Sequence, residues 1–243
     1  MEKADRRAHE RAAWVGRAER MRDAFGLVLA LVLLTYVLAS LLDNRGWSAV
    51  VLILATSTTS VVALVSAHAK AGFVRAAAWL SALTVLLAVG AAATDELALL
   101  NVASVVQISI LAAAMAAVLK RVIASAAVDS RTILGAISIY AVLGIVFTFA
   151  YGTIDRLQDS PFFEGVVHPE GSDFLFFSYT TLTTTGYGNL VPGGQPGRMV
   201  AGLEMMIGQI FLVTLVAGLV SLWQPGEALR RRRERREGPG EGA

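Results

Sequence analysis

The sequence predicts an all-α membrane protein with six transmembrane helices and a short re-entrant helix between the fifth and the sixth. Three observations predict this class. The 243 residues are 55% hydrophobic with a mean hydropathy of +0.60, well above a usual soluble domain. The apolar residues fall into runs long enough to cross about 30 Å of hydrocarbon as helices. The lysines and arginines, all but Arg45, Arg156 and Arg198, fall on one predicted side of the membrane.

Six apolar segments have the length of a transmembrane helix. They are residues 24–42, 48–69, 76–93, 97–119, 132–152 and 199–223. An even number of crossings puts both termini on one side, and the basic residues put that side in the cytoplasm. We therefore expect a multi-pass protein of the plasma membrane with cytoplasmic termini.

Charged segments flank the apolar region. Residues 1–23 are rich in arginine, lack the apolar core and cleavage site of a signal peptide, and predict a cytoplasmic charged helix. Residues 224–243 form a basic cytoplasmic tail. The tail either anchors the topology or binds anionic lipid. The candidate lipid-binding residues are Arg230, Arg231, Arg232 and Arg233.

Residues 24–130 form the predicted four-helix transmembrane unit. Its fourth helix has no charge within the span, and its polar residues are Asn101, Ser104, Gln107 and Ser109. Voltage sensing requires several charges inside the membrane field. We therefore expect this unit not to respond steeply to voltage.

Residues 131–223 form the second predicted unit. Its apolar run at 173–183 reaches only about 16 Å as a helix, which is too short to cross. We expect a re-entrant half-helix with Ser172 or Asp173 as N-cap. The irregular backbone beyond it is tolerated at membrane depth only when protein or water encloses it. A single chain cannot supply that enclosure, so we expect an oligomer around a central axis.

Five acidic residues lie between the fifth transmembrane segment and the start of the half-helix. They are Asp155, Asp159, Glu164, Glu170 and Asp173. Such a cluster on the outer approach raises the local cation concentration. The alternative is ordinary solvation of a loop.

Several classes of protein are excluded or disfavoured by what the sequence lacks. The chain has no cysteine and a net charge of only +2, which argues against thiolate metal sites and against nucleic-acid binding. Zinc-ligand spacing, a phosphate-binding loop and a nucleophile–base constellation are also absent from the sequence. We therefore expect no enzyme activity.

The half-helix leads into Thr184-Thr185-Gly186-Tyr187-Gly188, in which both glycines can adopt positive φ at little cost. This stretch resembles the TVGYG selectivity filter of potassium channels, whose carbonyl oxygens replace the hydration shell of the ion. The order of helix, half-helix, filter and helix over residues 132–223 resembles the pore module of that family. Over residues 1–130 the resemblance is one of layout, to six-helix channels of the bacterial type without a charged voltage sensor.

The resemblance implies a homotetramer that binds potassium in the filter and needs no other cofactor. By position, the Thr184 hydroxyl and the carbonyls of Thr185, Gly186 and Tyr187 are the implied potassium ligands, and Gly188 ends the filter strand. The implied function is passive, potassium-selective conduction without steep voltage dependence. Two alternatives stay open: a non-selective cation channel of the same architecture, and a non-conducting membrane sensor or accessory subunit.

The filter departs from the family pattern at two positions, Thr185 and Asn189. Thr185 stands where the family usually has Val or Ile, and its hydroxyl needs a partner. Asn189 stands where Asp is usual, and Thr180 where some members have Glu. We expect Thr180, Thr183, Asn189 and Glu204 to support the filter, in an arrangement different from that of the family.

Two residues of the last helix are further candidates. Glu204 is an acid inside a spanning segment, which is costly and marks a functional site by default. We expect it to hydrogen-bond behind the filter, to Thr180 or Thr183; the alternative is a cation site or proton sensor. Gly208 resembles the gating hinge of the family, and its alternative role is close packing against the half-helix or a neighbouring helix. By helical spacing, Gln209, Leu212, Val216 and Val220 are candidates to line an inner cavity.

Overall fold

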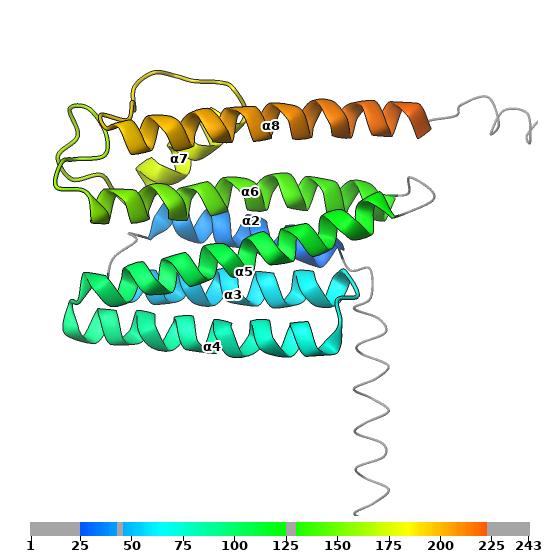
Figure 1. Ribbon diagram of the computed structural model, residues 1–243, viewed down its shortest axis with the longest axis horizontal. Helices are drawn as coiled ribbons and strands as arrows, with labels where there is room; N and C mark the ends of the chain where they lie inside the picture. The colour runs from blue at the N-terminus through cyan, green and yellow to red at the C-terminus, as the bar shows by residue number, and fades with distance from the viewer. Residues whose placement is uncertain (1–24, 43–45, 125–129, 223–243) are drawn as a thin grey trace, which may run out of the picture.

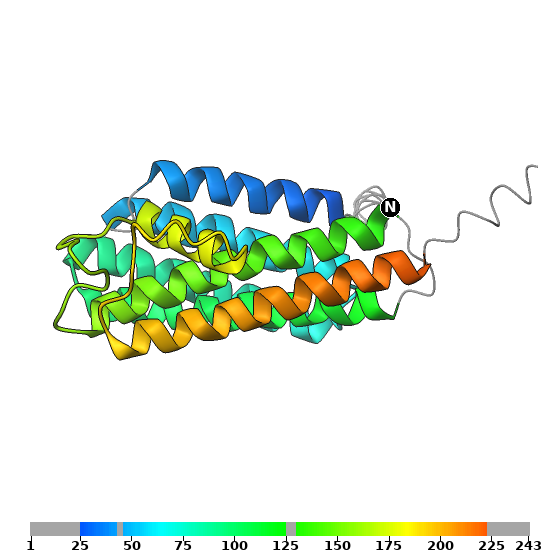
Figure 2. The same cartoon turned by 90° about the horizontal axis from the view of Figure 1, so that it is seen from above.

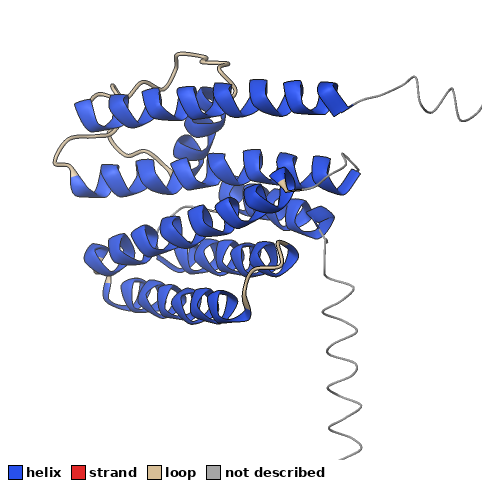
Figure 3. Cartoon of the chain, turned by 45° about the vertical axis from the view of Figure 1, so that its right-hand side comes forward, coloured by secondary structure: helices blue, strands red, loops and turns tan. Residues whose placement is uncertain are grey.

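The computed structural model describes residues 25–42, 46–124 and 130–222, and every regular element in these ranges is a helix (Figures 1 and 3). The all-α class is therefore confirmed. The predicted helix at 1–23 and the arginines at 230–233 lie outside the described residues. The helices are α2 (Phe25–Leu41), α3 (Gly46–Ser66), α4 (Ala71–Thr94), α5 (Leu97–Ile123), α6 (Ser130–Leu157), α7 (Gly171–Leu182) and α8 (Gln195–Leu222).

Among the described helices, five are long and apolar enough to cross a membrane: α3, α4, α5, α6 and α8. The chain is therefore a membrane-spanning protein. The first predicted span corresponds to α2, which is apolar but has 17 residues. The crossing of the membrane by α2, which would bring the total to six, stays a prediction.

Several helix boundaries differ from the predicted ones. α4 begins at Ala71 rather than at 76, α6 continues to Leu157 rather than ending at 152, and α8 begins at Gln195 rather than at 199. The predicted limits followed apolarity, which marks the hydrocarbon layer. Charged residues at the membrane surface, such as Arg156 in the last turn of α6, do not end a helix. Arg156 is thus helical and not part of the outer loop.

The short helix α7 lies between α6 and α8, and it also contacts α2 (Figures 1 and 2). The N-cap prediction was wrong: the N-cap is Glu170, and the helix starts at Gly171. The reason is a capping box, in which the Asp173 carboxylate accepts a hydrogen bond of 2.9 Å from the Glu170 backbone N–H. Asp173 therefore caps the helix from the third position of its first turn.

Two clusters of buried side chains organise the chain. The larger joins α2, α3, α4 and α5 to one face of α6, so the four-helix unit packs against α6 of its own chain. The smaller is aromatic and surrounds α7. It contains Tyr151, Phe162, Phe163, Phe174 and Phe177. Close packing of this kind holds helices together in hydrocarbon, where transfer from water contributes nothing.

Polar contacts link the helices of the four-helix unit. The Gln107 side-chain oxygen on α5 accepts hydrogen bonds from Ser57 on α3 at 3.1 Å and from Thr84 on α4 at 3.3 Å. At the end of α6, Arg156 donates to Asn101 at 2.7 Å and to Ser104 at 3.0 Å, both on α5. Three of the four polar residues predicted on the fourth helix therefore fix its position against α3, α4 and α6, whereas Ser109 donates to the Val105 carbonyl within α5.

Candidate functional site

The backbone alternates in handedness from residue 184 to residue 188. Thr184, Gly186 and Gly188 have φ of +57°, +51° and +78°, whereas Thr185 and Tyr187 do not have positive φ. The positive φ predicted for the two glycines is thus present. The positive φ of Thr184 was not predicted, because a β-branched residue rarely adopts it. Strain of this kind persists only where surrounding contacts enforce it.

The last turn of α7 supplies those contacts. The backbone N–H groups of Thr185 and Gly186 both donate to the Thr180 carbonyl, at 2.8 and 3.1 Å, and the Thr184 N–H donates to Thr181 at 3.0 Å. Thr180 therefore contacts the 184–188 segment through its carbonyl, while its hydroxyl bonds within α7 to Phe177. The negative end of the α7 dipole lies at the start of this segment, where it favours a cation.

The Thr185 hydroxyl has the partner that its position requires. Its oxygen lies 2.8 Å from the Thr183 hydroxyl oxygen, and Thr183 in turn donates to the Tyr179 carbonyl at 2.6 Å. Because Thr183 has a single hydroxyl hydrogen, Thr185 must be the donor of the first bond. A threonine is thereby accommodated at a position where the potassium channels that the sequence resembles usually have Val or Ile.

Glu204 is fully buried on α8 and holds three helices together. Its two oxygens lie 2.5 Å from the Tyr151 hydroxyl on α6 and 2.5 Å from the Ser178 hydroxyl on α7. The predicted partners Thr180 and Thr183 were therefore wrong, since both turn their hydroxyls to carbonyls of α7. The correct partners depend on how α6 and α7 are rotated about their axes. The sequence signal for the partner on α6 was Tyr151, a hydroxyl-bearing residue within a predominantly apolar helix.

The other two predicted support and hinge residues are Asn189 and Gly208. Asn189 is exposed, and no side-chain hydrogen bond of it occurs within the described part of the chain, so its supporting role stays a prediction. Gly208 packs tightly against the end of α7: a Cβ there would lie 2.7 Å from the Leu182 carbonyl oxygen. This contact favours the packing alternative, and the hinge role stays a prediction.

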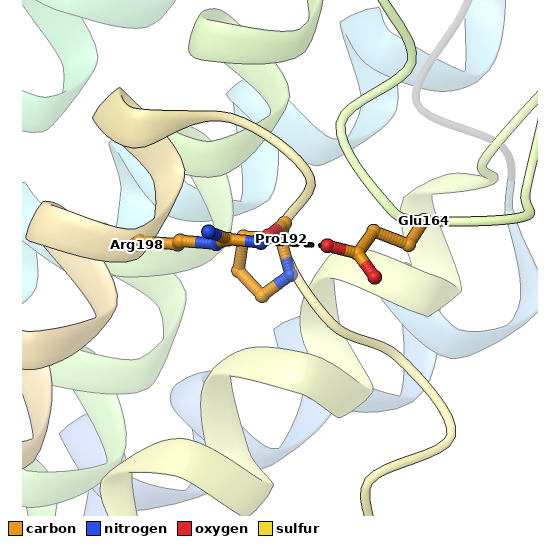
Figure 4. A network of polar contacts seen from close by, with 3 residues as sticks. All are labelled: Glu164, Pro192 and Arg198. Carbon is orange, nitrogen blue, oxygen red and sulfur yellow. Dashed lines mark hydrogen bonds and ion pairs between the residues drawn. The ribbon is translucent and has the colours of Figure 1, made fainter.

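A clamp of three residues, Glu164, Pro192 and Arg198, joins the loop before α7 to the loop after residue 188 (Figure 4). Arg198 donates to the Pro192 carbonyl at 3.0 Å and forms a 2.6 Å ion pair with Glu164. Backbone bonds between residues 162–164 and 191–193 reinforce it. Of the five outer acids, Glu164 is thus paired, while Asp155 and Asp173 accept backbone N–H groups. Glu164, Asp155 and Asp173 therefore stabilise the loops and helix ends in this part of the chain.

The substitution Glu164→Gln is expected to lower stability by less than about 1 kcal/mol, because both side chains of the pair are mostly exposed. Thermal unfolding of the purified protein at low and at high salt measures the effect. Any difference from the wild type should shrink at high salt, which screens exposed charges. Loss of folded protein would show instead that the ion pair is essential to the clamp.

One surface of the single chain is unusually open and apolar. Residues 183–189 are exposed, with Tyr187 at 70%, and α8 presents a broad exposed apolar face beside them. Gln209 and Leu212 belong to this surface, whereas the side chains of Val216 and Val220 lie outside those described. The most exposed large side chains of α8 are Met199, Met206, Ile210 and Val213, at helical spacing. Irregular backbone at membrane depth requires enclosure by protein or water, and the single chain leaves residues 183–189 without protein on this side.

A short helix and exposed irregular backbone lie between the two long helices α6 and α8, in the order that the sequence predicted over residues 132–223. Residues 139–224 match the family model described as an ion channel. A cyclic nucleotide-gated potassium channel of Rhizobium etli is 32% identical over 93 residues, which are 38% of this chain and 24% of that protein. The chain spans about a quarter of the length of that relative, and no solved structure matches significantly. The predicted resemblance to the potassium channel family is confirmed.

Proposed function

We propose that the protein is a passive, potassium-selective channel, in which four chains bring residues 184–188 together around a central axis. The observation that supports this most is the alternation of φ at Thr184, Gly186 and Gly188 on an exposed surface. In such a backbone, successive carbonyls can face one line and replace ion hydration. Conduction involves no chemical step and requires no cofactor beyond the transported potassium.

Each residue of the proposed filter has a separate role. The Thr184 hydroxyl and the carbonyls of Thr185, Gly186 and Tyr187 coordinate the ion, and Gly188 ends the strand. The rigidity of the filter comes from Thr180, Thr183 and Glu204, through the hydrogen bonds described above. Asn189 completes the support through contacts between chains.

The proposed assembly is a homotetramer of subunits with six transmembrane helices and one re-entrant pore helix, α7. The protein lies in the plasma membrane with both termini on the cytoplasmic side, because the basic residues concentrate on that side. The arginines at 230–233 bind anionic lipid there. The exposed apolar face of α8 lies at the interface between chains and along the inner cavity.

Reversal potentials of purified protein in planar bilayers test the proposal. With potassium on one side and sodium on the other, the reversal potential should follow the potassium gradient. Equal permeability for the two ions would support the non-selective channel. Absence of cation flux across a range of lipids, pH values and voltages would support the non-conducting sensor or accessory subunit.

The channel is expected to gate without steep voltage dependence, since the charges of α5 lie in its last turn, at Lys120 and Arg121. A helix without charge inside the membrane field moves no gating charge. Open probability measured between strongly negative and strongly positive voltages should change only weakly. A gating charge of several elementary charges per channel would contradict this expectation.

A further inference from the structure

The carbonyl of Leu182 is held between two helices directly before the proposed filter. Leu182 is the last residue of α7, is buried, and lies two residues before Thr184. Carbonyls at a helix C-terminus lack partners within the helix. Those of Tyr179, Thr180 and Thr181 receive N–H groups from residues 183–186. The Leu182 carbonyl is different, because its donor comes from another helix.

That donor is the Tyr140 hydroxyl on α6, at 3.0 Å. In addition, α8 approaches the same carbonyl so closely at Gly208 that a Cβ would lie 2.7 Å from the oxygen. The carbonyl is therefore confined by a hydrogen bond from α6 and by the backbone of α8. A movement of α6 or of α8 therefore shifts the Leu182 carbonyl, because closely packed interiors have few voids that could absorb the movement.

Tyr140 is itself positioned by α8. Its ring stacks on Phe211, with centroids 5.8 Å apart and an interplanar angle of 21°. Phe211 lies three residues after Gly208, which places both on one face of α8. A bend of α8 near Gly208 therefore shifts the tyrosine and the wall of the carbonyl site together.

We propose that Tyr140 is a positioning residue that couples α8 to the inner end of the filter through the Leu182 carbonyl. The inference rests on the proposed channel function. The hydroxyl of Tyr140 fixes the position of the last turn of α7. It thereby also fixes the position of the Thr184 hydroxyl, two residues further along the chain. Phe211 transmits the position of α8 to Tyr140.

Tyr140→Phe removes the hydroxyl and keeps the ring that stacks on Phe211. The matched control is Tyr179→Phe, because the Tyr179 hydroxyl also joins α7 to α6, by donating to the Ala141 carbonyl at 2.6 Å. Both variants lose one tyrosine–carbonyl hydrogen bond, but only the first loses it at the filter. The potassium-to-sodium permeability ratio of reconstituted protein is expected to fall about fivefold in Tyr140→Phe, as for loss of one hydrogen bond, and to stay unchanged in Tyr179→Phe.

Each outcome is decisive. Wild-type permeability in Tyr140→Phe, or an equal loss in both variants, overturns the coupling while leaving the channel function intact. If Tyr140→Phe does not assemble, Phe211→Leu takes its place, since it frees the tyrosine ring and keeps the hydroxyl; an unchanged ratio there overturns the proposal. A wild-type protein that does not conduct refutes the proposed function itself.

Discussion

Gly186→Ala is expected to abolish potassium flux while the protein still folds and assembles. Gly186 has φ of +51°, where an alanine costs about 1–2 kcal/mol. A Cβ at Gly186 meets no atom within 4 Å in the chain, so the fold itself tolerates the methyl group. The strain is relieved by rotation of the neighbouring peptides, which turns carbonyls away from the ion path. Potassium flux into liposomes and size-exclusion chromatography measure the two properties.

Gly202→Ala is the matched control for this prediction. Gly202 lies on α8 and does not have positive φ, and a Cβ added there would also meet no atom within 4 Å. It should retain wild-type flux and assembly. Wild-type flux in Gly186→Ala would mean that the alternating backbone does not carry the ions.

Glu204→Ala is expected to destabilise the assembled protein strongly and to reduce flux at least tenfold. The substitution leaves the buried Tyr151 hydroxyl without its acceptor, while the Ser178 hydroxyl keeps only the Gly144 carbonyl and no longer joins α7 to α8. Each unsatisfied buried group costs about 1–3 kcal/mol. Because α6, α7 and α8 meet at this carboxyl, its loss also loosens the support of the proposed filter. Heating in detergent, followed by measurement of the remaining oligomer, gives the stability.

Glu204→Gln separates the hydrogen-bonding role from the charge. The amide can accept from one hydroxyl and donate to the other, so we expect near-normal stability and flux. Normal thermal stability of Glu204→Ala would refute the structural role. A wild-type current that changes with pH, together with a Glu204→Gln current that does not, would support the proton-sensor alternative.

Features that depend on local sequence could be predicted. The apolar segments indicated the positions of the helices, and the shortness of 173–183 predicted the short helix observed at Gly171–Leu182. The positive φ of Gly186 and Gly188 followed from glycine alone. These predictions hold because length, apolarity and backbone freedom are properties of the segment itself.

Features that depend on contacts between segments could not be predicted. The partners of Glu204 come from residues 53 and 26 positions away, and they are set by the rotation of α6 and α7. The positive φ of Thr184 arises from the hydrogen bonds of the last turn of α7, against the preference of threonine. The ion pair of Glu164 with Arg198 joins the loop before α7 to the first turn of α8, and the proximity of these two segments depends on the folded chain.

The most direct test of the proposed filter is to locate heavy monovalent ions in crystals of the purified protein. Rubidium or thallium can replace potassium, and their anomalous scattering marks the occupied sites. We expect a row of peaks on a four-fold axis, within coordination distance of the carbonyls of Thr185, Gly186 and Tyr187 and the hydroxyl of Thr184. Residues 184–188 facing lipid, or an assembly without peaks on a shared axis, would contradict the proposed filter.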